Sequence, residues 1–332
     1  MAMNFNSRDM VDVVLEITAM KSKLLLTDGN LLSLSQRHEG LRDLAEYIKM
    51  PSRWVRIYPE EFEDYVLSLR KAVGNLSDDE DSTTVMVKRT KALFASGQDV
   101  ETAQRVVEQL IRQRDVNNLS LIHELCTKEN VAPTTVIELL LMYAEMQNRW
   151  SFTYMFQNVQ TRDDWDGVRS LDDLFQTEIV PHNQLVYFDQ EFINYLSENN
   201  DDIHAIHWRN FERIVGEFFN KIGYTVELGP GRADGGVDLR IYNDQHTEKG
   251  PPLIIVQCKR YKKGNLVDVN TVKAFYADVL HEEARIGLIA TTSMIEPAGK
   301  KVIHARGYNV ATAESREVAK MINGMWRTHF RG

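Results

Sequence analysis

The second half of the chain alternates between helical and extended hydrophobic patterns, beginning near residue 200. Apolar residues at intervals of three and four predict helices, and short runs rich in β-branched and aromatic residues predict strands. The helices are expected at about 206–222, 267–281, 296–305 and 314–326, and the strands at 224–228, 236–242, 252–258, 286–291 and 308–311. This alternation predicts an α/β domain in which helices flank a central mixed sheet.

The first half carries mainly helical patterns and no motif that assigns it to a family. Helices are expected at 59–73, 99–114 and 132–147. The pattern of residues 10–30 is compatible with strands that end in a turn at Asp28, Gly29 and Asn30. The sequence alone does not decide the structure of this segment. The acidic run at 77–82 predicts an exposed loop. The chain is therefore divided into a mainly helical region for recognition, regulation or assembly at 1–202 and an α/β domain at 203–332.

Composition narrows the class of protein. Hydrophobic residues make up 43% and charged residues 26% of the 332 residues, which is typical of globular domains. No apolar run approaches the ~20 residues that span a bilayer, and the first residues lack the pattern of a secretion signal. Cys126 and Cys258 lie far apart and form no CxxC pair, which fits a reducing compartment. We expect a cytoplasmic protein with no membrane partner.

Charge is distributed unevenly along the chain, whose net charge is −9. Residues 203–332 hold 19 Lys and Arg against 14 Asp and Glu, a net charge of +5. Residues 1–202 hold 20 bases against 34 acids, a net charge of −14. Such asymmetry indicates that the basic half meets a polyanion.

Acidic side chains in two segments of the second half are candidates for chemistry. In the helical stripe of residues 210–224, Glu212 falls at the edge, partly screened from water, whereas Glu217 points away as a solvated charge. An ordinary flanking acid is the competing interpretation of Glu212. In 231–242, Gly235 and Gly236 permit a tight turn into a strand. Asp238 then lies inside that strand, where an acid needs a partner, a metal or solvent.

The segment "LIIVQCKRYKK" at 253–263 completes the candidate site. Alternation along a strand directs Gln257 and Lys259 to one face and Cys258 to the other, as a small buried hydrophobe. With Asp238 on a neighbouring strand, this face presents a carboxylate, an amide oxygen and an ammonium. Oxygen ligands suit Mg²⁺, and a lysine beside the ion can hold or deprotonate a water that attacks phosphorus. A solvated strand end is the competing interpretation.

Basic residues surround this segment and suit a phosphate backbone. Tyr261 among them could stack on a base or bond to a sugar, and ordinary surface charge is the alternative. The candidate nucleic-acid-binding residues are Arg232, Arg260, Tyr261, Lys262, Lys263 and Lys273. Lys300 and Lys301 are further bases elsewhere in the second half of the chain.

Residues from about 206 to 312 resemble the Mrr-like restriction endonuclease domain of the PD-(D/E)xK nuclease superfamily. The resemblance runs in order through "FERIVGEFFNKIGY", "DGGVDLRIY", "LIIVQCKRYKK", "VNTVKAFYADVL" and "IGLIATTS". It implies that Asp238, Gln257 and the backbone carbonyl of Cys258 bind metal, that Lys259 is the catalytic lysine, and that Glu212 helps through water. Gln257 stands where the wider superfamily has Glu or Asp, which is the D-QxK form usual in the Mrr-like branch.

The resemblance further implies hydrolysis of DNA phosphodiesters that depends on Mg²⁺, with Mn²⁺ as a substitute, in restriction or anti-phage defence. Cutting both strands with one site per chain suggests a dimer or a higher homo-oligomer. The acidic first half fits a protein partner, oligomerisation or restraint of the nuclease better than a clamp on DNA. Two alternatives are a nuclease for RNA or branched DNA, and a catalytically silent nucleic-acid-binding module.

Overall fold

The computed structural model describes residues 2–76, 89, 91–95, 97, 99–113, 118–150, 167–181, 183–231, 236–243 and 250–326. Two compact units are present. One holds residues 77–166 together with Met1, and the other holds 2–76 together with 167–332. The segment 77–166 is thus inserted into the sequence of the larger unit. The predicted boundary between residues 202 and 203 lies inside the larger unit and stays a prediction.

A five-stranded mixed sheet forms the centre of the C-terminal region, as the sequence predicts. The strand order is β11-β9-β7-β6-β5. The pairs β5–β6 and β6–β7 are antiparallel, and the pairs β7–β9 and β9–β11 are parallel. A short parallel pair, β8 and β10, accompanies the sheet. The strands are β5 (Tyr224–Leu228), β6 (Leu239–Asn243), β7 (Ile254–Lys259), β8 (Leu266–Val267), β9 (Ile286–Thr291), β10 (Met294–Ile295) and β11 (Val310–Ala313).

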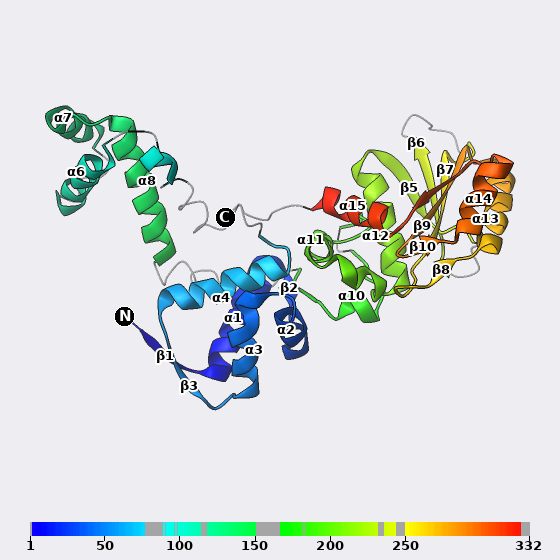
Figure 1. The fold of residues 1–332 in the computed structure, drawn as a ribbon, viewed down its shortest axis with the longest axis horizontal. Coiled ribbons are helices and arrows are strands. Elements are labelled where there is room, and N and C mark those ends of the chain that lie inside the picture. Colours follow the sequence, from blue (N-terminus) through cyan, green and yellow to red (C-terminus); the bar gives the residue numbers. More distant parts are fainter. Residues whose placement is uncertain are drawn as a thin grey trace. The chain divides into compact units, whose positions relative to one another are not determined.

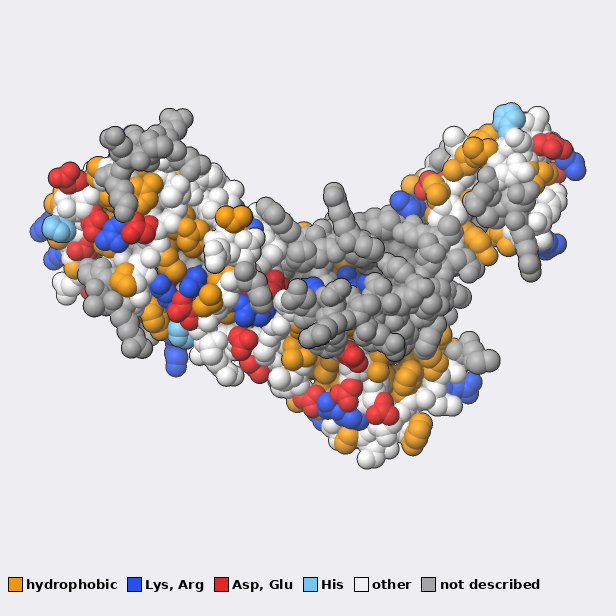
Figure 2. Space-filling view, turned by 180° about the vertical axis from the view of Figure 1, so that it is seen from behind, with side chains coloured by type: hydrophobic (Ala, Val, Ile, Leu, Met, Phe, Trp, Pro, Cys, Tyr) orange, Lys and Arg blue, Asp and Glu red, His pale blue; other side chains and the backbone are white. Residues whose placement is uncertain are grey.

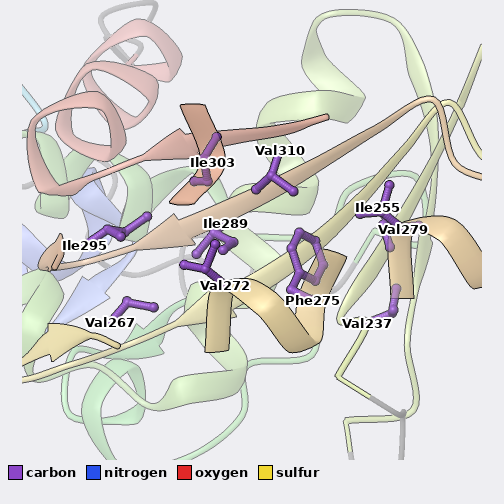
Figure 3. Close-up of a cluster of buried hydrophobic side chains, with 10 residues drawn as sticks. All are labelled: Val237, Ile255, Val267, Val272, Phe275, Val279, Ile289, Ile295, Ile303 and Val310. Carbon is purple, nitrogen blue, oxygen red and sulfur yellow. The ribbon is translucent and has the colours of Figure 1, made fainter. Parts of the chain in front are cut away.

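Helices cover both faces of this sheet (Figure 1). On one face lie α12 (Trp208–Lys221) and α15 (Ser315–Met325), and on the other lie α13 (Val269–His281) and α14 (Pro297–Arg306). Parallel neighbours need a crossover, and α13 and α14 supply the two crossovers β7–β9 and β9–β11. Figure 3 shows the core between the sheet and α13 and α14, made of Val237, Ile255, Val267, Val272, Phe275, Val279, Ile289, Ile295, Ile303 and Val310.

The first 76 residues form a mainly helical lobe of the larger unit. Residues 7–22 are helical rather than extended, which settles the segment that the sequence left open. Asp28, Gly29 and Asn30 form the first turn of a helix, because the Thr27 hydroxyl accepts a bond from the Asn30 N–H. The elements are β1 (Met3–Asn6), α1 (Ser7–Ser22), β2 (Leu24–Leu25), α2 (Asp28–Ser35), η1 (Glu39–Leu41), α3 (Arg42–Lys49), β3 (Trp54–Ile57) and α4 (Pro59–Ala72).

Residues 167–207 connect this lobe to the α/β domain. They contain β4 (Arg169–Ser170), α10 (Asp173–Gln176), α11 (Gln190–Glu198) and η3 (Asn200–His204), and β4 pairs with β2. The Asn199 amide donates to the carbonyl of Ala72 at 2.8 Å, and the Trp326 indole donates to the carbonyl of Gly74 at 2.8 Å. Residues 2–76 and 167–332 are therefore joined by hydrogen bonds within one packed unit.

Among the described residues of the inserted unit, the helices include α6 (Val100–Gln113), α7 (Leu119–Glu129) and α8 (Pro133–Trp150). Their core consists of Ala103, Val106, Val107, Leu110, Ile122, Leu125, Cys126, Val131 and Val136. With α4, they confirm the mainly helical first half. The acidic run at 77–82 lies outside the described residues. Among the described helices, none is long and apolar enough to cross a membrane.

The carboxyl of Glu191, in the first turn of α11, makes stability depend on pH. Burial, with a smaller contribution from the neighbouring Asp189, raises the pKa of Glu191 to about 7, although a backbone hydrogen bond, Arg169 and Lys23 partly oppose the shift. The folded chain therefore holds a proton that the unfolded chain has lost, so stability falls as pH rises from the ordinary carboxyl pKa to about 7. We expect Glu191→Gln to raise the free energy of unfolding at pH 8 by up to about 3 kcal/mol.

Urea titrations at pH 5 and pH 8 measure this effect. Glu198→Gln in the same helix is the control, because that side chain is exposed. An equal response of the two variants to pH would contradict the prediction.

Candidate active site

Asp238 lies directly before β6, against the end of β7. Its backbone N–H donates to the carbonyl of Val256 at 2.9 Å, and its Oδ2 accepts a bond from the backbone N–H of Cys258 at 2.6 Å. These two bonds hold Asp238 against residues 256–258 of β7, directly after the pair Leu239 and Val256 in the β6–β7 register. Both side chains are buried, with 8% of Asp238 and 7% of Gln257 exposed.

The amide of Gln257 has one satisfied and one unsatisfied end. Its Nε2 donates to the carbonyl of Gly236 at 3.0 Å. Because a carbonyl can only accept, this bond fixes the orientation of the amide. Its Oε1 is buried without a hydrogen-bond partner in the described structure. A buried acceptor in this state is costly unless a donor or a cation completes it.

Lys259 is the last residue of β7 and is half-buried. Strand alternation directs its side chain to the face that carries Gln257. Within the residues that the structure describes, its ammonium forms no ion pair. Its carbonyl is held by the hydroxyl of Thr291 at 2.8 Å on the neighbouring strand β9.

The pKa of the Cys258 thiol depends on the charged side chains around it. Burial raises the pKa of Cys258 well above its usual value, and the carboxylates of Asp238 and Glu212 raise it further, while Lys259 and Arg209 lower it. All four charged groups are therefore close to this point of β7. A thiol with a raised pKa stays protonated near neutral pH, which favours the interpretation of Cys258 as a packing residue over a nucleophile.

Glu212 is more buried than the sequence indicated, with 4% of the residue exposed. Arg209, one helical turn earlier, holds it through Nη1 at 2.5 Å. Arg209 also donates to the carbonyl of Gly229 at 2.5 Å and lies 3.4 Å from the carboxylate of Glu178. Sequence reasoning missed this arginine, although a spacing of three residues along a helix is the signal for such a pair.

The expectation that Glu217 is a solvated charge is wrong. Glu217 is 1% exposed, accepts a bond from the backbone N–H of Tyr187 at 2.7 Å, and pairs with Lys221 at 3.2 Å. The segment around Tyr187 covers this side of α12. The pattern of α12 alone carries no information about a segment about 30 residues away in the chain.

The donor atoms of this site fit Mg²⁺. The carboxylates of Asp238 and Glu212 and the amide oxygen of Gln257 are hard oxygen donors, and Mg²⁺ usually takes few protein groups and keeps several waters. The unsatisfied Oε1 of Gln257 is the observation that supports this fit. Groups of three or more His, Cys, Asp and Glu suited to a metal are absent from the described part of the chain, so a site here depends on the amide and on backbone oxygen.

The predicted nucleic-acid-binding residues have different surroundings. Lys262, Lys263 and Lys273 are exposed, and Lys263 pairs loosely with the exposed Asp201 at 3.5 Å. Arg260 instead donates to the carbonyl of His204 at 3.1 Å, and Tyr261 packs partly against the core. Arg232 lies outside the described residues. On the face drawn in Figure 2, Lys and Arg are mixed with Asp and Glu.

Gly236 brings the turn before β6 into contact with Gln257. Its φ is +93°, and a Cβ at this position would lie 3.1 Å from Nε2 of Gln257. Gly236→Ala should therefore strain the backbone and displace the amide. We expect a 10- to 100-fold loss of the nuclease activity that the sequence resemblance implies. This loss corresponds to about 1–3 kcal/mol in the activation free energy. Cleavage rates of the purified variants measure it.

The control is Gly223→Ala. Gly223 has the same φ of +93°, with no atom within 4 Å of a Cβ, so it separates backbone strain from displacement of Gln257. Equal losses in the two variants would count against a role for the Gln257 amide.

Comparisons with known proteins show what the C-terminal part of the chain is similar to. A family model described as a restriction endonuclease, Mrr_cat, matches residues 203–322. A solved structure, "MspJI Restriction Endonuclease in Complex with 27-mer Oligonucleotide", aligns with 18% sequence identity and a TM-score of 0.32. The alignment covers 53% of this chain and 41% of that chain. No curated protein matches the chain. Residues 203–322 therefore match the Mrr_cat restriction endonuclease family model, which agrees with the resemblance that the sequence indicated.

Proposed function

We propose that this protein is an Mg²⁺-dependent DNA endonuclease, with Mn²⁺ as a substitute, whose active site consists of Asp238, Gln257, Lys259 and Glu212. The observation that carries the proposal is the buried, unsatisfied Oε1 of Gln257, next in sequence to Cys258, whose N–H donates to the carboxylate of Asp238. The restriction endonuclease family match supports it.

The residues of the chain divide the work. Asp238 and Gln257, with the carbonyl of Cys258, would hold the ion, which supplies positive charge to stabilise the phosphate and the departing oxygen. Lys259 orients the attacking water and accepts its proton or stabilises the charge that develops. Arg209 fixes the carboxylate of Glu212, so Glu212 acts on the site through water. The exposed Lys262, Lys263 and Lys273 attract the phosphate backbone.

The biological role proposed is restriction or anti-phage defence in the cytoplasm. In this proposal residues 1–202 provide recognition, oligomerisation or regulation, and 203–332 cut DNA, as a dimer or a larger homo-oligomer. The net charge of −14 on residues 1–202 supports a protein contact for part of that region.

The test is cleavage of supercoiled plasmid by the purified full chain. We expect nicked or linear product with Mg²⁺ or Mn²⁺ and none with chelator. Methylated and unmodified plasmid, single-stranded RNA and branched DNA are compared in parallel. RNA or branched DNA cut in place of plasmid would redirect the proposal to another substrate, and binding of plasmid without cleavage under all conditions would contradict it.

A further inference from the structure

The two-stranded ribbon formed by β1 and β3 presents an outer face that its own lobe leaves uncovered (Figure 1). Trp54 is 72% exposed, and Arg56 beyond it is exposed on the same face. Asn4 is exposed and lies opposite Arg56 in the register. The exposed Arg53 and Tyr58 flank the strand at its two ends. These five residues are called the ribbon surface.

The inner face of the ribbon is fixed to its lobe. Val55 and Ile57 are buried, and Phe5 stacks on Phe62 of α4, with ring centroids 6.1 Å apart. A tryptophan that core packing needed would lie on this side. Its place on the opposite, exposed side leaves the indole free of core packing and accessible to a ligand.

The charge of the ribbon surface fits a polyanion. Residues 3–6 and 50–58 contain no Asp or Glu, and Arg53 and Arg56 form no ion pair with any residue that the structure describes. Other bases of the same lobe are paired: Arg8 with Asp12 and Asp28, Arg42 with Glu39, and Lys49 with Glu46. The guanidinium groups of Arg53 and Arg56, beside the exposed indole of Trp54, therefore differ from these paired bases of the lobe.

The acidity of the first half does not argue against this contact. Residues 2–76 hold 10 bases against 11 acids, whereas 77–202 hold 10 bases against 23 acids. The lobe that carries the ribbon is close to neutral, and repulsion of DNA comes from the other segments. Arginine binds phosphate through a planar fork, asparagine reads base edges, and tryptophan stacks on bases and sugars.

We propose that the ribbon surface is a second DNA-contacting surface, separate from the nuclease site, with Arg53 and Arg56 on phosphates and Trp54 against the sugar and base. The inference relies on the proposed function only for the choice of DNA as the polyanion. Binding is therefore measured without cleavage.

The experiment is fluorescence anisotropy of the full chain with a labelled duplex of about 25 base pairs, in chelator, at several salt concentrations. Each phosphate contact contributes about 0.9 to the slope of log K against log salt. Arg53→Ala/Arg56→Ala should lower that slope by about 1.8. Trp54→Ala should weaken binding at least about 5-fold, the lower end of the effect of losing a base stack, and Trp54→Phe should restore most of it.

The control is Arg42→Ala/Lys49→Ala, which removes the same charge from paired residues of α3. An unchanged slope and affinity in Arg53→Ala/Arg56→Ala, or no more change than in the control, would overturn the proposal. A protein would then be the remaining candidate partner for the ribbon surface. Absence of duplex binding by the unmodified chain would also overturn it. Loss of cleavage with these effects on binding intact would count against the nuclease proposal alone.

Discussion

Asp238→Asn should abolish cleavage of plasmid DNA while leaving the fold intact. The asparagine Oδ1 can still accept the bond that the N–H of Cys258 donates to Asp238 at 2.6 Å. The local structure should therefore be retained, while the negative charge proposed to hold the metal is removed. Loss of one such electrostatic contact lowers rates by about 10²–10³-fold. A metal ligand should lie at or above the upper end of that range, so we expect a loss of at least about 10³-fold.

Single-turnover cleavage at saturating Mg²⁺ measures the effect, and circular dichroism and thermal melting check the fold. Lys259→Ala should give a similar loss, of about 10²–10⁴-fold, if the lysine transfers a proton or stabilises developing charge. Glu317→Gln is the matched control, because that exposed carboxylate of α15 lies in the same domain. Activity of Asp238→Asn within 10-fold of the unmodified chain would end the case for this site.

Local signals in the sequence predicted the α/β domain well. The strand at 224–228 has the bounds of β5, because Gly223 and Gly229 delimit an alternating run. The helix expected from 267 begins at Val269, since the Asp268 side chain accepts bonds from the N–H groups of Asn270 and Thr271 and caps α13. The strand expected from 236 begins at Leu239, because Gly236 and its neighbours form the turn that leads into it.

Contacts between distant segments were not predictable in this way. The burial of Glu217 depends on Tyr187, and the packing of residues 2–76 against the C-terminal region depends on bonds such as Trp326 to Gly74. The approach of Gly74 to the carbonyl of Asn194 is so close that a Cβ would lie 1.9 Å away. Hydrophobic periodicity describes one helix at a time and carries no information on such partners.

In the candidate site, too, local features were predictable from the sequence and contacts between distant segments were not. Strand alternation and the D-QxK pattern singled out Asp238, Gln257 and Lys259, and the structure bonds Asp238 to Val256 and Cys258, the two neighbours of Gln257 in the chain. The state of the Gln257 amide, with Nε2 on Gly236 and Oε1 unsatisfied, depends on a turn that the sequence alone does not orient. The role of these residues in catalysis stays a prediction until the variants are assayed.

Arg209 links three parts of the larger unit, and its removal should have the largest effect on stability. It pairs with Glu212 on α12, donates to the carbonyl of Gly229 after β5, and approaches Glu178 from the connecting segment. Its side chain is 9% exposed and that of Glu212 is 5% exposed. Removing one partner of a buried pair leaves the other charge uncompensated, which costs about 3–5 kcal/mol. Arg209→Met should therefore destabilise the chain by that amount.

Urea titrations at pH 7 of Arg209→Met, Glu212→Gln and the double variant separate the pair from the rest of the network. If the cost is the isolated charge of Glu212, then the double variant should recover at least about 1 kcal/mol relative to Arg209→Met, since neighbours in one network are not additive. Arg213→Met is the control, because Arg213 pairs with the more exposed Glu178 at 2.6 Å and should cost about 1 kcal/mol or less. Strict additivity of Arg209→Met and Glu212→Gln would show that the two side chains act independently. Recovery of stability without recovery of cleavage in the double variant would assign Arg209 to folding and the Glu212 carboxylate to the chemistry.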